Sequence, residues 1–428
     1  MLISFTVSNY LSFKEKMVFT MQATSVREFR DTNTFPSPHP EILTLRSAAL
    51  YGPNSSGKSN LLKAIQFMSR FVLNSAKGIA GTEELPDNRF KLSTSTAKKP
   101  SYFKMEFIHD KQIYVYEFEF DKKEIISEQL MYKRKVTDAK IFSRKKTKIE
   151  IEEKFKSGTK AIEYTRSNAL FLSTAALLNV DWAMELLKAF NKFRFLHIRV
   201  PHNMAWAGLT SNIYENQQYR KQIDRLLIGS NLGFNKVTEE VINIQPETSD
   251  SRKTNQSIFF SESKIKLIYT LHDQLDDKGE IKSQIAFSLD EESDGTKKYF
   301  SMIGPIVEAL AEGVVLIVDE FTSHLHPILA EHLIKLFHNS KINKGNGQLI
   351  IATHNTYLLN EDLYRKDQIY FIEKDKFYAT KLKRLSDSEL FKDVRQETNF
   401  EKRYIHDRQL GALPQWTVNE SNFWSENY

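Results

Sequence analysis

Residues Gly52 to Ser59 read GPNSSGKS and stand between two segments of different periodicity. The preceding run SAALY, at 47–51, is short and apolar, as expected of a buried strand. In the following segment, 60–72, apolar residues recur at helical spacing. Strand, glycine-containing loop and helix is the context in which this pattern forms a phosphate-binding loop. A chance glycine turn with an exposed lysine is the alternative, and the flanking segments argue against it.

Each part of this loop has a physical reason to hold a nucleotide. Its two glycines permit backbone conformations closed to other residues, so that successive N–H groups converge on phosphate oxygens at a helix N-terminus. Lys58 is expected to bridge the β- and γ-phosphates, and the Ser59 hydroxyl to coordinate Mg²⁺. We therefore predict ATP and Mg²⁺ as cofactors. The predicted ATP-binding residues are Gly52, Pro53, Asn54, Ser55, Ser56, Gly57, Lys58, Ser59 and Asn60.

Two carboxylates follow a second apolar run, VVLIV at 314–318. A continuous run of this kind is typical of a strand that a parallel sheet buries on both faces. Asp319 and Glu320 stand at its C-terminal end, where ligands bind in open α/β sheets. We predict that Asp319 holds Mg²⁺ together with Ser59, and that Glu320 is catalytic and orients the attacking water. Solvated carboxylates at the end of an ordinary strand are the alternative, which the upstream phosphate-binding loop disfavours.

His354 is the second predicted catalytic residue. It follows the apolar run LIIA at 349–352, and a histidine in that place can hydrogen-bond the γ-phosphate and the water. A capping or core histidine is the alternative. The loop after the acidic strand is expected to face a partner subunit; its residues are Thr322, Ser323, His324 and Leu325. The two histidines of FTSHLHP lack further clustered ligands, so a metal site there is not favoured.

The stretch ESDGTK lies ahead of the acidic strand. Apolar residues recur from 299 to 310 at steps of three and four, which predicts a helix with a kink or restart at Pro305 and an end at Gly313. The N-terminus of such a helix offers free N–H groups and a positive dipole, suited to a γ-phosphate presented by another subunit. An N-capping turn is the more common explanation for such a loop. The residues predicted to act in trans are Ser293, Asp294, Gly295 and Thr296.

Composition limits the class of protein. With 428 residues, 41% of them apolar, the chain can bury a large core. It has no cysteine, which excludes disulfide scaffolds and thiol chemistry. Its net charge of +6 permits contact with nucleic acid without requiring it. No apolar run approaches the roughly 20 residues of a membrane span, and no secretory leader is present, so we expect a cytoplasmic protein.

The motifs resemble the ABC-type ATPase head shared by SMC, RecF and OLD proteins, in the order Walker A, signature, Walker B, D-loop and His-switch. They are more closely similar to the RloA and AbiL type of bacterial AAA family ATPase, found in anti-phage and abortive-infection operons, and to the ATPase AriA of the PARIS system. The stretches that carry the resemblance are NYLSF (9–13), GPNSSGKSNLLKAI (52–65), EESDGTKKYF (291–300), VDEFTSHLHP (318–327), THN (353–355) and YIHDRQLGALP (404–414). Phe321 and Thr322 depart from the aliphatic residue and aspartate that are more usual in this group. No glutamine is assigned as the Q-loop residue.

The resemblance implies an α/β fold: an ABC-type P-loop ATPase head, with a largely parallel sheet flanked by helices, a β-rich lobe and a mainly helical insertion. We place the N-terminal lobe at 1–135, the insertion at 136–256 and the C-terminal lobe at 257–428. No sustained heptads occur, so the insertion is expected to be compact and not a coiled coil. The resemblance also implies a dimer of heads, or a higher homo-oligomer, that closes over ATP.

The predicted function is a slow, regulatory, Mg²⁺-dependent ATPase of an anti-phage system. ATP binding between heads would control a separately encoded effector, such as a TOPRIM, HNH or RloB-like protein, because the chain has no Asp-x-Asp pair and little sequence after His354 for a nuclease domain of its own. The alternative is a RecF-like or SMC-like DNA-binding ATPase in repair, which would use the basic segment 132–148. A solvated lysine-rich hairpin is the plainer interpretation of that segment. The large insertion and the C-terminal segment disfavour a transporter subunit.

Overall fold

The computed structural model describes residues 1–77, 84–134, 138–196, 203–243, 264–387, 400, 401 and 404. The chain forms two compact units. The first comprises residues 1–197, 310–323 and 330–428, and the second comprises residues 198–309 and 324–329. Among the described residues, no helix combines the length and the apolarity needed to cross a bilayer.

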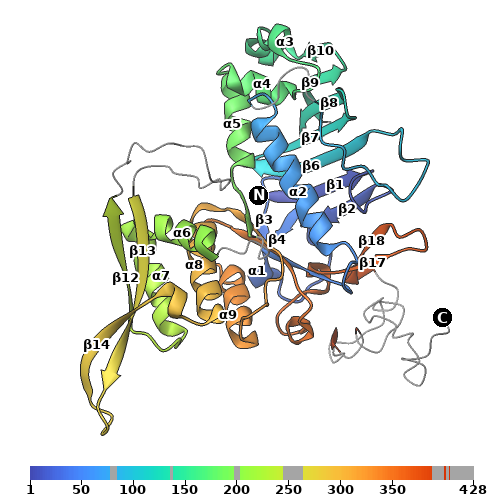
Figure 1. Cartoon of the computed structure of the whole chain (residues 1–428). Coiled ribbons are helices and arrows are strands. Elements are labelled where there is room, and N and C mark those ends of the chain that lie inside the picture. The colour runs from blue at the N-terminus through green and yellow to red at the C-terminus, as the bar shows by residue number, and fades with distance from the viewer. Residues whose placement is uncertain are drawn as a thin grey trace, which may run out of the picture. The chain divides into compact units, whose positions relative to one another are not determined.

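A six-stranded sheet carries the predicted site in the first unit (Figure 1). Its strands, in the order of the sheet, are β11 (Phe193–Leu196), β15 (Val315–Val318), β16 (Gln348–Ala352), β5 (Ser47–Tyr51), β17 (Ile369–Lys374) and β18 (Thr380–Arg384). Neighbouring strands pair in parallel, except that β17 and β18 form an antiparallel hairpin. β5, β15 and β16 are buried along their whole length, as continuous apolar runs in a parallel sheet are. Their carboxyl ends therefore meet at one edge of the sheet.

The first unit also contains a β-rich lobe, which is an antiparallel sheet of seven strands. Its strands, in the order of the sheet, are β10 (Lys148–Ile151), β9 (Ala139–Lys145), β8 (Ile125–Tyr132), β7 (Gln112–Phe120), β6 (Ser101–His109), β1 (Leu2–Ser8) and β2 (Met17–Thr20). Burial alternates along most of β6 and β7, which is the pattern of a sheet with one covered face.

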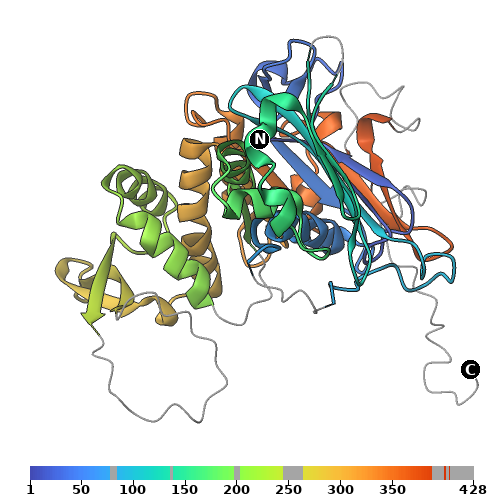
Figure 2. The same ribbon diagram turned by 90° about the horizontal axis from the view of Figure 1, so that it is seen from above.

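Helix α2 (Lys58–Asn74) links the two sheets of the first unit. It begins directly after the glycine-containing loop and runs beside the seven-stranded sheet, as Figures 1 and 2 show. Its Phe67 ring lies 5.3 Å from the ring of Phe103 and 5.6 Å from the ring of Phe120, measured between centroids. Aromatic packing of this kind holds the middle of the helix against the lobe.

The remaining elements of the first unit are short or peripheral. They are α1 (Arg30–Asn33), β3 (Thr34–Pro36), β4 (Leu43–Leu45), η1 (Glu153–Gly158), α3 (Ala161–Tyr164), α4 (Phe171–Leu177), α5 (Asp181–Phe190), the part of α9 (Pro327–His338) from Ala330 onward, η3 (Thr356–Leu358), η4 (Lys366–Gln368) and η5 (Leu385–Asp387). Residues 139–196 belong to this unit because β9 and β10 extend the lobe and β11 pairs with β15.

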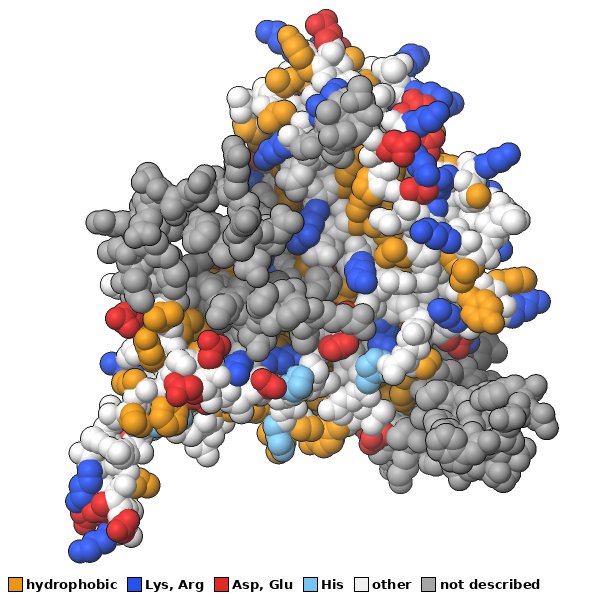
Figure 3. Space-filling view, in the orientation of Figure 1, with side chains coloured by type: hydrophobic (Ala, Val, Ile, Leu, Met, Phe, Trp, Pro, Cys, Tyr) orange, Lys and Arg blue, Asp and Glu red, His pale blue; other side chains and the backbone are white. Residues whose placement is uncertain are grey.

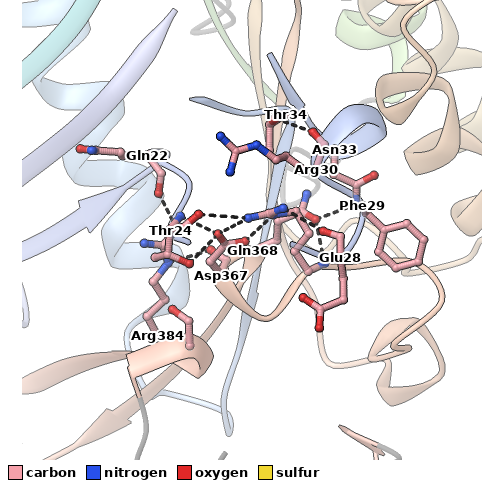
Figure 4. A network of polar contacts seen from close by, with 12 residues as sticks. Gln22, Thr24, Glu28, Phe29, Arg30, Asn33, Thr34, Asp367, Gln368 and Arg384 are labelled. Carbon is pink, nitrogen blue, oxygen red and sulfur yellow. Dashed lines mark hydrogen bonds and ion pairs between the residues drawn. The ribbon is translucent and has the colours of Figure 1, made fainter. Parts of the chain in front are cut away.

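A buried polar network ties the N-terminal region to the segment that precedes β17 (Figure 4). The Arg365 guanidinium donates to both carboxylate oxygens of Asp367, at 2.8 and 2.7 Å, and to the Glu28 carbonyl at 2.8 Å. The same carboxylate accepts from the Thr24 backbone N–H at 2.7 Å and from the Thr24 hydroxyl at 2.9 Å. Each charge of this buried ion pair has further hydrogen-bond partners, which offset the cost of removing the two charges from water.

The second unit combines helices with a small antiparallel sheet. Its elements are α6 (Asn203–Tyr214), α7 (Gln217–Gly229), β12 (Lys236–Asn243), β13 (Lys264–Leu275), β14 (Ile281–Ser288), η2 (Leu289–Glu291) and the first part of α8 (Asp294–Glu312). The sheet order is β12-β13-β14. The Thr210 hydroxyl of α6 donates to the Phe300 carbonyl of α8 at 3.0 Å, which packs these two helices together.

The predicted fold class is confirmed. The structure has a largely parallel sheet with flanking helices and a separate β-rich lobe. The strand, loop and helix around Gly52 lie where the sequence places them, and Pro305 is inside α8. Gly313 follows the end of α8 with φ of 70°.

Candidate nucleotide-binding site

The loop after β5 has the tight geometry that its glycines predict. Gly57 has φ of 116°, and a Cβ there would collide with the Thr380 side chain. A Cβ at Gly52 would collide with the Ile372 carbonyl oxygen. Only glycine fits either position, because the backbone approaches its neighbours too closely for a side chain. The loop is therefore held in one conformation at the N-terminus of α2, where N–H groups are free to bind phosphate.

Lys58 is the first residue of α2, and its side chain reaches back to the start of this loop. Its ammonium group donates to the Gly52 carbonyl at 2.7 Å and to the Pro53 carbonyl at 2.9 Å. Burial lowers the pKa of Lys58 to about 8, against the opposing charges of Asp319 and Glu320. The lysine thus closes the loop into a ring, and the charges of Asp319 and Glu320 act on it.

A second support of the loop comes from β18 and from the N-terminal lobe. The Thr380 hydroxyl donates to the Ser56 carbonyl at 2.8 Å, and its oxygen lies 2.8 Å from the Ser12 hydroxyl oxygen. Asn60 donates from its amide to the same Ser12 hydroxyl at 2.8 Å. Ser12 lies in the NYLSF stretch, but nothing in the sequence distinguished Thr380. The fit to a triphosphate is good, because both ends of the loop are anchored while Asn54 and the Ser59 side of α2 remain accessible.

Asp319 and Glu320 follow β15 as predicted. Asp319 is buried, and its backbone N–H donates to the Leu196 carbonyl at 3.0 Å. Glu320 has φ of 48°, in the left-handed region where a residue with a long side chain costs about 1 kcal/mol. Its N–H donates to the Asp319 carboxylate at 3.1 Å. Backbone strain of this kind persists where neighbouring structure enforces it, and such positions cluster at functional sites.

His354 belongs to the same edge of the sheet. It follows β16, and Thr353 before it is buried and donates its N–H to the Leu50 carbonyl at 3.1 Å. Burial and the nearby Lys58 charge lower the pKa of His354, while Glu320 and Asp319 oppose them. The imidazole is therefore neutral at pH 7 and sits within electrostatic reach of the lysine and both carboxylates.

A metal ion at this edge of the sheet would need ligands from a bound phosphate as well as from the protein. Within the described parts of the chain, His, Cys, Asp and Glu side chains do not gather into a group able to hold a metal by themselves. Mg²⁺ is commonly bound by one or two protein oxygens together with substrate phosphates and water. Ser59 at the start of α2 and Asp319 at the end of β15 are of the right chemical type, so the residues fit Mg²⁺ bound with a nucleotide.

The SDGT loop has N-capping geometry in the second unit. The Ser293 hydroxyl accepts from the Thr296 N–H at 3.1 Å and lies 3.0 Å from the Thr296 hydroxyl. A Cβ at Gly295 would come 2.7 Å from the His324 carbonyl oxygen, so these two segments are in close contact. The N-cap interpretation and the role in trans are compatible, because a capped helix start still directs N–H groups outward.

The loop after Glu320 is ordered by its own contacts. The Thr322 hydroxyl lies 2.8 Å from the Thr353 hydroxyl, and the Ser323 N–H donates to the Glu320 carbonyl at 3.1 Å. His324 has φ of 59°, and Leu325 is buried. The action of these residues on a partner subunit stays a prediction. The next histidine, His326, accepts from the Ile328 N–H at 3.3 Å, which is a capping contact at the start of α9.

One residue of the C-terminal stretch YIHDRQLGALP reaches the site. Tyr404 stacks on Phe371 of β17, with centroids 5.1 Å apart and an interplanar angle of 14°. Its hydroxyl hydrogen-bonds the backbone of Gly52, and burial raises the pKa of Tyr404 to about 12. Residues 405–414 of that stretch lie outside the described residues.

A family model and several solved structures match the chain. The model is described as "AAA domain, putative AbiEii toxin, Type IV TA system" and matches residues 47–360, which include every predicted site residue from Gly52 to His354. No curated protein matches the sequence.

Among solved structures, the SMC head domain from Thermotoga maritima is 14% identical and has a TM-score of 0.41, with 90% of this chain and 98% of that chain covered. The SMC head domain with an extended coiled coil from Pyrococcus furiosus, bound to the C-terminal domain of ScpA, is 11% identical with a TM-score of 0.42, and 89% and 95% are covered. An SMC head bound to the C-winged helix domain of ScpA is 13% identical with a TM-score of 0.45, and 91% and 99% are covered. At these values the likeness concerns the general fold alone, and the site rests on the geometry of this chain.

Proposed function

We propose, because the chain belongs to the AAA domain family described as putative AbiEii toxin of a type IV TA system, that it is a regulatory ATPase of a bacterial anti-phage system. ATP binds between the heads of a cytoplasmic homo-oligomer in this proposal. Closure of the heads controls a separately encoded effector, which is a toxin or a nuclease.

The observation that carries the proposal is the placement of four residues directly after the carboxyl ends of three adjacent parallel strands. Lys58 follows β5, Asp319 and Glu320 follow β15, and His354 follows β16. The charges of both carboxylates act on Lys58 and on His354, so the four groups share one electrostatic environment. An unrelated set of loop residues would not be expected to converge at the edge where open α/β sheets bind ligands.

Each of these side chains has a chemical task in the proposal. The Lys58 ammonium binds the β- and γ-phosphates in place of the two loop carbonyls. Ser59 and Asp319 hold Mg²⁺, which supplies charge neutralisation at the phosphates when bound. The Glu320 carboxylate orients and polarises the attacking water, and neutral His354 donates a hydrogen bond to the γ-phosphate oxygen.

The test separates binding from hydrolysis. Glu320→Gln keeps the size of the side chain but removes its basicity, so we expect hydrolysis to fall about 10²-fold or more while ATP remains bound. Lys58→Ala is expected to abolish ATP binding. Glu163→Gln, at an exposed glutamate of α3, is the matched control. Turnover and molar mass are measured with and without ATP. Wild-type turnover in Glu320→Gln, or an unchanged mass of that variant with ATP, would overturn the proposal.

The DNA-binding alternative finds less support in the basic segment 132–148. Arg144 is buried, lies 3.5 Å from Glu128, and donates to the Ala169 carbonyl at 2.5 Å. Lys133 pairs with an acidic side chain of β6 at 3.0 Å, and Lys146 with one of the β7–β8 turn at 2.9 Å. These cations are compensated within the chain, so they are less available for phosphates of a nucleic acid.

A further inference from the structure

We propose that the turn between β17 and β18 is the platform for the nucleotide base, with Phe377 stacking on the base of a bound purine nucleoside triphosphate. The inference rests on the proposed function, because it concerns the same ATP. It extends the site from the phosphates to the base.

The turn presents two aromatic side chains to solvent on a well-built support. Phe377 is 54% exposed and Tyr378 is 66% exposed. The Asp375 carboxylate accepts from the Phe377 N–H at 2.9 Å and from the Ala379 N–H at 3.0 Å. The backbone of the turn also closes on itself through the Tyr378 N–H, which donates to the Asp375 carbonyl at 2.9 Å. The turn therefore holds two exposed rings in a fixed place, from which Phe377 can stack on a ligand.

The order of the strands decides which end of a nucleotide would reach this turn. β16 and β15, which carry His354 and Glu320, lie on one side of β5, and β17 and β18 lie on the other side. β17 runs parallel to β5, so the β17–β18 turn is at the same edge of the sheet as the phosphate-binding loop. A nucleotide whose γ-phosphate faces Glu320 and His354 therefore directs its base toward the β17–β18 turn.

Hydrogen bonds hold the turn close to the loop. Thr380, three residues after Phe377, donates from its hydroxyl to the Ser56 carbonyl of the loop at 2.8 Å and from its N–H to the Ser12 carbonyl at 2.8 Å. Three residues of chain span at most about 11 Å, so the Phe377 backbone cannot lie farther than that from Thr380. Asn60, on the first turn of α2, shares the Ser12 hydroxyl with Thr380. These bonds tie the start of β18, which follows the turn directly, to the phosphate-binding loop.

Two lysine ammonium groups lie over the Phe377 ring. The Lys14 ammonium lies 4.9 Å from the Phe377 ring centroid, and the Lys376 ammonium lies 5.2 Å from it. Hydrophobic side chains and Lys or Arg side chains occur together at the right-hand edge of Figure 3, where Figure 1 draws this turn. An aromatic ring beside cations is the combination that binds bases by stacking and phosphates by charge.

The experiment compares two ligands on the full chain. ATP carries the base, whereas inorganic tripolyphosphate offers the phosphates alone. We expect Phe377→Ala to weaken ATP binding about tenfold or more, from the loss of one base stack. Its affinity for tripolyphosphate should equal that of the wild type. Phe377→Trp keeps a stacking surface and should restore ATP affinity. Tyr164→Ala removes another exposed aromatic ring, 66% exposed and located on α3, and is the matched control.

The outcomes separate this inference from the proposed function. If Lys58→Ala abolishes ATP binding but Phe377→Ala binds ATP like the wild type, the platform is refuted and the ATP site stands. Equal losses for ATP and tripolyphosphate in Phe377→Ala would also refute it, since the ring would then act on the phosphates. If Phe377→Ala weakens binding of a single-stranded oligonucleotide and not of ATP, the turn is a nucleic-acid surface instead. A wild-type protein that binds no ATP would overturn both proposals.

Discussion

The hydroxyl oxygen of Thr322 lies 2.8 Å from the hydroxyl oxygen of Thr353. This contact joins the loop after β15 to the loop after β16, and the Phe321 N–H adds a bond to the Ala352 carbonyl at 3.0 Å. Glu320 immediately precedes Phe321, and His354 immediately follows Thr353. The two predicted catalytic side chains are therefore positioned by a shared set of bonds, and the threonine at 322 supplies one of them.

Thr322→Ala is expected to lower the ATP turnover number about tenfold, because loss of the contact lets Glu320 and His354 move relative to each other. Thr322→Ser keeps the hydroxyl and should retain wild-type turnover. The Michaelis constant for ATP should change little in both variants, since neither residue belongs to the phosphate-binding loop. Steady-state kinetics at saturating Mg²⁺ measure both constants. A tenfold loss in Thr322→Ser as well would show that the methyl group, not the hydroxyl contact, matters.

ATP affinity should fall as the pH rises above about 8. The pKa of Lys58 is lowered to about 8, mainly by burial, so the free protein loses the ammonium charge above that pH. A bound triphosphate stabilises the charged form, and binding must then take up a proton. We expect the dissociation constant to rise by up to about tenfold per pH unit above pH 8. Equilibrium titrations with ATP between pH 7 and 9.5 measure this, and the same affinity at both ends would contradict it.

The phosphate-binding half of the site could be predicted from sequence because its signals are local. Gly57 and Lys58 lie between an apolar strand and a helical repeat, and Asp319 ends another apolar run. Thr380 had no such signal, since its bond to Ser56 joins residues 324 positions apart and depends on which strands are neighbours. The order of the parallel strands in a sheet cannot be read from a single sequence.

The basic segment shows a different limit of sequence reasoning. A run of lysines and arginines predicts a solvated face, yet strand alternation places Arg144 opposite Glu128 in the register of β8 and β9. The Glu128 carboxylate also accepts from the Phe171 N–H at 2.7 Å and the Leu172 N–H at 3.0 Å. Burial raises the pKa of Glu128 against the Arg144 charge. The charge of Arg144 predicted an exposed side chain. Its position opposite Glu128, which is also buried, explains why Arg144 is buried instead.

Arg144→Ala is therefore expected to destabilise the protein by about 3 kcal/mol or more, because it leaves a carboxylate buried without its cation. Lys145→Ala, one position along β9, should change stability by less than about 0.5 kcal/mol, since its side chain is exposed. Chemical denaturation of the two variants measures the difference. Equal stabilities would show that Glu128 is protonated in the folded protein and needs no cation.

Neutral His338 should make the protein sensitive to mild acid. The imidazole, at the end of α9, lies 2.7 Å from the Ser47 hydroxyl at the start of β5. Burial lowers the pKa of His338 to about 3, and the charges of Arg46 and Lys335 act in the same direction. Below pH 6.5 the unfolded chain therefore binds a proton that the folded chain does not.

The free energy of unfolding should consequently fall as the pH drops from 6.5 toward 3, by up to about 1.4 kcal/mol per pH unit from this group. Above pH 6.5 the histidine is neutral in both states and contributes no slope. His338→Gln keeps a hydrogen-bonding side chain without a titrating ring, so its stability should depend less on pH between 6.5 and 5. His332→Gln, at an exposed position of the same helix, is the matched control and should behave like the wild type. Urea unfolding at pH 7 and pH 5 measures the change, and identical slopes for His338→Gln and the wild type would mean that other groups cause the acid sensitivity.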